Sequence, residues 1–322
     1  MGHAAVSGND DVVFRALRLR VFRNGLLRCR WLMVATLGFC ASVSIPWAVS
    51  QGIPSIKAAR TADPLAESPR AWAVDAVANE LVALHHPNSY LRYRMHVVDL
   101  KGDQVRDVIE SKDGSVARLI LKDGRPLTAD EDKAERQRLD VMIASPADYA
   151  KHIKDEASGR KTADELMRLM PDAMIYTYTP GQPQTGTNGG GLEVVLDYKP
   201  NPKFSPPTTA SEALTGLEGR AWIDVKSRQL VRMEGTIFRG VNFGWGVLAH
   251  IYPGGHLELE QANVGGSRWI FTHFEERVSA RALMVKTINI HTVVDAGSFQ
   301  TLGPMGYQDA VRMLLNTPLP SK

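Results

Sequence analysis

Residues 219–235 read Gly-Arg-Ala-Trp-Ile-Asp-Val-Lys-Ser-Arg-Gln-Leu-Val-Arg-Met-Glu-Gly, two runs of alternating apolar and polar side chains joined by a short polar turn. Alternation with period two is typical of half-buried antiparallel strands, so the segment predicts a β-hairpin. The side chains on its apolar face are Ala221, Ile223, Val225, Val231, Met233 and Ile237.

The opposite face of this hairpin carries Trp222 and Asp224, which we expect to fix the register and curvature of the sheet rather than to contact a ligand. Gly-x-x-Trp-Ile-Asp, a short turn and Leu-Val-Arg-Met-x-Gly together resemble the central hairpin of the LolA/LolB-like superfamily, periplasmic proteins that carry or anchor outer-membrane lipoproteins. The resemblance implies an unclosed β-barrel with helices as a lid and an apolar hollow for acyl chains. Pro-Asn-Pro at 200–202 and Phe-Gly-Trp-Gly at 243–246 also resemble elements of uncharacterised envelope proteins.

The first 50 residues differ from the rest and are typical of an export signal. Six arginines precede an uncharged, largely apolar run over 31–52, and Ala48-Val49-Ser50 places small residues where a signal peptidase cuts. We therefore predict a periplasmic protein cleaved before Gln51. The alternative is an uncleaved anchor in the inner membrane, because the run is long enough to span a bilayer.

Charge and cysteine content exclude several classes of function. Six of the 38 Lys and Arg residues and two of the 35 Asp and Glu residues lie in the first 50, so the remainder is nearly neutral. It has no long basic run, which argues against a nucleic-acid partner. Both cysteines, Cys29 and Cys40, lie in the same segment, so the exported part has neither a disulfide nor a thiol nucleophile.

The remaining chain is expected to form one domain. Residues 51–67 are rich in Ala, Pro and Ser and predict a flexible leader, followed by a single domain over 68–318. Ser68-Pro69 opens a helix that ends near His85. The segment 128–170 predicts a helical insertion of about three pieces, interrupted at 145–146 and 158–159, and the glycines of 180–191 predict a flexible loop.

Short alternating runs separated by Asp-Gly and Pro-Gly turns recur along the domain, the first three over 90–100, 103–111 and 115–121. About ten antiparallel strands result. The predicted class is α+β, a strongly curved antiparallel sheet in the form of an unclosed β-barrel, with helices covering its concave side.

A strongly curved sheet encloses more apolar surface than two or three helices can cover, and the remainder would form a hollow suited to acyl chains. The alternative is that these side chains form an ordinary filled core. The candidate ligand-binding residues are the large apolar groups of the second half: Phe238, Phe243, Trp245, Leu248, Leu257, Leu259, Trp269, Phe271, Ile288 and Ile290.

These observations favour a non-enzymatic periplasmic protein that binds acyl lipid or lipoprotein, acts in lipoprotein sorting to the outer membrane and meets a membrane-associated partner. No catalytic residue, metal or cofactor is predicted. One alternative is an envelope sensor or interaction module of the same fold. Another is an exported hydrolase that uses His250, His256 or His273, although no His-x-His or Glu-x-x-His spacing accompanies them.

Overall fold

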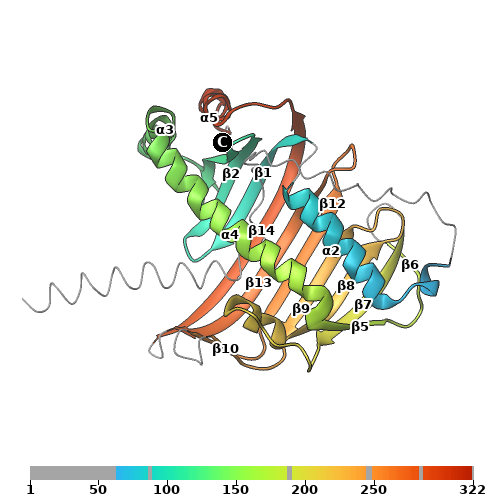
Figure 1. The fold of residues 1–322 in the computed structure, drawn as a ribbon. Coiled ribbons are helices and arrows are strands. Elements are labelled where there is room, and N and C mark those ends of the chain that lie inside the picture. Colours follow the sequence, from blue (N-terminus) through green and yellow to red (C-terminus); the bar gives the residue numbers. More distant parts are fainter. Residues whose placement is uncertain (1–62, 86–88, 187–190, 244–248, 283–285, 321–322) are drawn as a thin grey trace, which may run out of the picture.

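The computed structural model describes residues 63–85, 89–186, 191–243, 249–282 and 286–320. The predicted export segment and residues 51–62 of the predicted leader lie outside this part of the chain. The described residues form one antiparallel sheet of fourteen strands with helices against it (Figure 1). The α+β class, the antiparallel sheet and its unclosed form are therefore confirmed.

Eleven strands follow one another across the sheet in the order β4-β3-β2-β1-β14-β13-β12-β9-β8-β7-β5, while β6 pairs with β7, and β11 joins β10 to β13. Their bounds are β1 (Tyr90–Asp99), β2 (Gly102–Ser111), β3 (Gly114–Lys122), β4 (Arg125–Pro126), β5 (Met174–Tyr178), β6 (Gln184–Thr185), β7 (Leu192–Pro200), β8 (Leu217–Asp224), β9 (Leu230–Ile237), β10 (Val241–Phe243), β11 (Ala249–Ile251), β12 (His256–Asn263), β13 (Trp269–Ala282) and β14 (Lys286–Leu302).

The count of about ten strands corresponds to the longer members of the sheet. β4, β6, β10 and β11 have only two or three residues each, too few to show an alternating pattern in the sequence. β6 lies within the predicted loop 180–191, whose residues 187–190 fall outside the described part of the chain. β1 pairs with β14, the last strand in the sequence, so the first and last strands lie side by side in the interior of the sheet.

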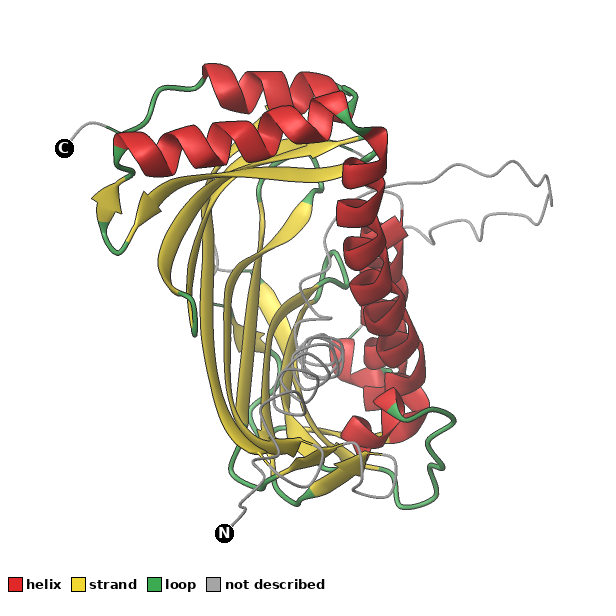
Figure 2. Cartoon of the chain, turned by 90° about the vertical axis from the view of Figure 1, so that its left-hand side faces the viewer, coloured by secondary structure: helices red, strands yellow, loops and turns green. Residues whose placement is uncertain are grey.

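Two helices lie along the concave side of the sheet and two lie across one end of it (Figure 2). On the concave side are α2 (Pro69–His85) and α4 (Pro146–Ala173), which pack against each other and against β5. At the end formed by β2 and β3 are α3 (Ala129–Ala144) and α5 (Tyr307–Asn316). Short 3-10 turns, η2 (Pro64–Ala66) and η3 (Ala210–Thr215), adjoin α2 and α4.

The helical insertion has two pieces rather than three. α3 begins with a capping box in which Thr128 and Glu131 satisfy each other's backbone N–H groups. It ends before Ser145, whose hydroxyl caps α4. α4 then continues through Ser158-Gly159. One glycine destabilises a helix by only about 1 kcal/mol, and this cost is outweighed because the later turns of α4 pack Leu166, Leu169 and Met170 against the main core.

The polar turn of the 219–235 hairpin holds α2 in place. The Asn79 side chain donates to the carbonyl oxygens of Ser227 and Arg228, at 3.1 and 2.9 Å. The Arg228 guanidinium lies 3.5 Å above the ring centroid of Trp72, which is fully buried, and pairs with Glu67 at 2.6 Å. The hairpin thus anchors the helix that covers it.

Replacing Arg228 with alanine is expected to lower the free energy of unfolding by about 1–2 kcal/mol, because a partly buried cation–π contact and its ion pair are lost together. Urea unfolding measures the change. R220A is the matched control. The exposed Arg220 pairs with Asp197 of β7 and lies 5.9 Å from the ring centroid of Trp222, at the outer limit of a cation–π contact, so this substitution should cost less than about 0.5 kcal/mol. Equal losses in the two variants would contradict the anchoring role of Arg228.

Candidate functional site

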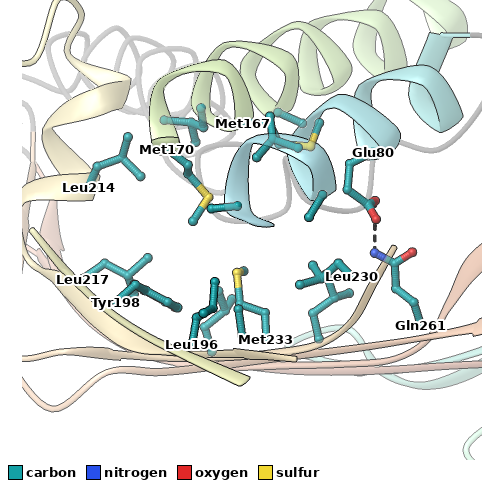
Figure 3. Close-up of a pocket in the computed structure, with 18 of the residues that line it drawn as sticks. Glu80, Met167, Met170, Leu196, Tyr198, Leu214, Leu217, Leu230, Met233 and Gln261 are labelled. Carbon is teal, nitrogen blue, oxygen red and sulfur yellow. Dashed lines mark hydrogen bonds between the residues drawn. The ribbon is translucent and has the colours of Figure 1, made fainter. Parts of the chain in front are cut away.

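A cavity of about 210 Å³ lies between the concave face of the sheet and the helices α2 and α4 (Figure 3). A single water needs roughly 10–15 Å³ on the same scale, so the space exceeds an ordinary packing defect many times over. Two helices and seven other elements line the cavity. The lining residues of the helices are Ala73, Ala76, Val77, Glu80 and Leu84 of α2, and Ala163, Leu166, Met167 and Met170 of α4. The other elements are β5, η3, β7, β8, β9, β12 and β13.

The roof of the pocket is built from helical residues spaced by three or four. Ala163, Leu166, Met167 and Met170 recur at the spacing that keeps side chains on one face of α4. α2 contributes Ala73, Ala76 and Val77, whose small side chains leave space beneath it. In Figure 3 the side chain of Met170 points down from α4 into this space.

The floor is the inner face of the hairpin and of the strands beside it. Ala221 and Ile223 of β8 line the pocket together with Leu230, Met233 and Ile237 of β9. The prediction that Trp222 and Asp224 face away is consistent with this placement: Asp224 closes the turn by accepting from Ser227, and Trp222 lies between Arg220 and Arg232. The motif therefore fixes the turn with one face and forms the pocket floor with the other.

A row of residues across four strands shapes one part of the floor. Tyr198, Gly219, Gly235 and Leu257 are direct neighbours in successive ladders. The Tyr198 hydroxyl donates to the Glu234 carbonyl oxygen at 2.7 Å and lies close to both glycines. The two glycines that bound the hairpin motif therefore leave room for the tyrosine, which reaches over them into the pocket.

Few polar groups enter this apolar pocket. Tyr176 and Tyr198 donate to the backbone carbonyls of Met170 and Glu234, and burial raises the pKa of both phenols. Gln261 Nε2 donates to Glu80 Oε2 at 3.1 Å. Burial raises the pKa of the Glu80 carboxyl from 4.5 to about 7, and the hydrogen bond from Gln261, the largest opposing effect, only partly offsets this.

The raised pKa of Glu80 predicts a pH-dependent stability. The pKa of Glu80 is higher in the folded state than in the unfolded state. The protonated carboxyl therefore contributes its full stabilisation below pH 4.5, and this contribution is lost as the pH rises through 7. From pH 5 to 8.5 the free energy of unfolding should fall by up to about 3 kcal/mol more in the wild type than in E80Q. Urea unfolding at the two pH values tests this, and identical pH dependence of the two proteins would contradict it.

Three of the ten candidate ligand-binding residues line the pocket: Leu257 and Leu259 on β12, and Phe271 on β13. Phe243 is buried in a separate apolar cluster with Val241 and Ile251. Phe238 is 42% exposed. The remaining described candidates, which are half-buried and do not line it, are Trp269, Ile288 and Ile290. Trp245 and Leu248 lie outside the described residues.

Most of the residues that line the pocket were not predicted from the sequence. They lie in helices and strands that were interpreted as structural elements and not as parts of a binding site. The roof residues of α4 belong to a segment interpreted as a polar insertion, although the spacing of Ala163, Leu166, Met167 and Met170 is a detectable apolar stripe. Nothing in the sequence marked Glu80 as a residue of the pocket. A glutamate in a helix ordinarily indicates a solvated face.

The histidines considered for catalysis lie in different places. His250 Nδ1 donates to Asn242 Oδ1, His273 contacts Asp295, and His256 borders the pocket with its side chain 41% exposed. Within the described residues, no group of three or more His, Cys, Asp or Glu side chains is arranged to hold a metal ion. No helix in that part of the chain has the length and apolar character needed to cross a membrane.

The chain has a distant structural similarity to a known protein. A scan against family models and a search of curated proteins gave no match. Among solved structures, the chain is similar to the crystal structure of a putative outer membrane lipoprotein-sorting protein domain from Vibrio parahaemolyticus, with a TM-score of 0.30 and 10% identity. The match covers 75% of this chain and 97% of that chain.

Proposed function

We propose that this chain binds acyl chains of lipids or lipoproteins in the pocket beneath α2 and α4, and that it does so without catalysing a reaction. The observation that carries the proposal is the pocket itself, about 210 Å³ and lined by apolar side chains apart from Glu80, Gln261, His256 and two tyrosines. Binding in such a pocket requires shape and apolar area, and it gains about 0.8 kcal/mol for each methylene removed from water.

The composition of the walls supports a flexible aliphatic ligand. Met167, Met170 and Met233 face the pocket from both the roof and the floor. Unbranched thioether side chains adapt to ligands of varying shape. Of the candidates named from the sequence, we assign Leu257, Leu259 and Phe271 to the binding wall.

We place this activity in the periplasm, in the sorting of lipoproteins to the outer membrane with a membrane-associated partner. Two features support the location: the arginine-rich, apolar segment over 1–50, which is typical of an export signal, and a remaining chain without cysteine. The hairpin at 219–235 supports the class of cargo through its resemblance to lipoprotein carriers.

The test is ligand uptake by the purified chain. Native mass spectrometry should detect co-purified acyl lipid, and the neutral apolar dye N-phenyl-1-naphthylamine should gain fluorescence and be displaced by long-chain lipids. Bare protein that takes up neither the dye nor lipid would overturn the proposal.

A further inference from the structure

The pocket has one polar end. Glu80 of α2 and Gln261 of β12 face each other there, and Leu214 and Leu217 lie at the opposite end of the space shown in Figure 3. The Gln261 amide donates to Glu80 Oε2 and so fixes the orientation of the carboxyl group. An apolar chain that fills the pocket would bring its own terminal group close to this pair.

The second carboxyl oxygen, Glu80 Oε1, is buried and has no hydrogen-bond partner among the described residues. A buried acceptor without a partner is costly, whereas a hydrogen bond to a charged group contributes about 1.5–3 kcal/mol. A ligand that places a donor at Oε1 would therefore gain affinity there.

The charge of the pocket limits which donor fits. No Lys or Arg is found among the described residues that line it, and its other ionisable groups are His256 and the two buried tyrosines. His256 is partly exposed and lies 3.8 Å from Glu258. A ligand carboxylate placed beside Glu80 would thus lose its hydration without meeting a cation.

We propose that the pocket selects long-chain ligands that end in an uncharged hydrogen-bond donor, a hydroxyl or an amide N–H, over free fatty acids, with Glu80 Oε1 as the acceptor. Gln261 is the positioning residue that holds the Glu80 carboxyl toward the ligand. This inference rests on the proposed function, and it names the ligand class that the same pocket takes.

The experiment compares ligands of equal chain length as competitors of N-phenyl-1-naphthylamine at pH 8. 1-Decanol carries a donor, nonyl methyl ether has the same number of chain atoms and an oxygen but no donor, and decanoate is charged. Wild-type protein should bind decanol about tenfold more tightly than the ether. E80L should abolish that preference, while E80Q should bind decanoate several-fold more tightly than the wild type because the negative charge is gone.

D75N is the matched control, because Asp75 is an exposed acid of the same helix that does not line the pocket. It should leave all three affinities unchanged. The same decanol-to-ether ratio in the wild type and E80L would overturn the proposal, as would a decanoate affinity that E80Q does not raise. If E80L no longer takes up the dye, the E80Q measurement decides alone. Failure of the wild type to bind the dye would overturn the proposed function as well.

Discussion

A163W is expected to abolish ligand uptake while the protein stays folded. Ala163 is buried on the pocket face of α4 and belongs to none of the closely packed apolar clusters, so a larger side chain there would extend into the cavity. An indole ring displaces roughly three or four methylenes of a bound chain, about 3 kcal/mol or a hundredfold in affinity. Dye titration measures the loss.

The matched control for this variant is A157W. Ala157 lies on the same helix and is exposed, so the same substitution should leave dye affinity within about twofold of the wild type. Circular dichroism and urea unfolding show whether both variants keep the fold. Normal dye binding by folded A163W would mean that ligands occupy a different part of the molecule, and it would count against the pocket as the binding site.

The architecture could be predicted from the sequence because it depends on patterns with a fixed period. The alternation in 219–235 gave the hairpin, and the apolar stripe after Ser68 gave α2. The two helices of the insertion differ from the expected three pieces because packing of Leu166 and Met170 outweighs the weak intrinsic cost of Gly159. Propensity is a local quantity, and tertiary contacts override it.

The pocket was harder to predict, because alternation says which face of a strand is apolar but not whether that face meets packed side chains or empty space. Phe243 and Phe271 follow the same strand pattern, yet Phe243 fills a packed cluster and Phe271 lines the cavity. The difference depends on what packs above each phenylalanine. The spacing between the sheet and the helices α2 and α4 is set only when the whole fold assembles, so the strand pattern does not reveal it. Glu80 is informative only once that cover is known.

G219A is expected to produce the largest loss of stability, because the residue lies where three chain segments approach closely. A Cβ at position 219 would lie 1.9 Å from the Glu234 carbonyl oxygen and 2.8 Å from the Tyr198 hydroxyl. The first contact is with the backbone of the neighbouring strand, which cannot move aside without breaking the ladder between β8 and β9. We expect a loss of about 3 kcal/mol or more, at the upper end of overpacking effects.

Two other glycine substitutions separate this clash from a general effect of replacing glycine in a strand. G235A places its Cβ 2.7 Å from the end of the Leu217 side chain, which can rotate away, so we expect a loss of about 1–2 kcal/mol. G297A meets nothing within 4 Å and should be neutral or slightly stabilising. Urea unfolding of the three variants gives the order, and a loss in G219A no larger than in G297A would show that the hairpin tolerates a side chain there. Tyr198 lies across both glycines, with its hydroxyl 2.8 and 3.0 Å from the positions that their Cβ atoms would take. Y198F keeps the ring, which lines the pocket, and removes only the hydrogen bond to the Glu234 carbonyl oxygen. It should therefore lower the free energy of unfolding by about 1 kcal/mol while leaving dye uptake intact.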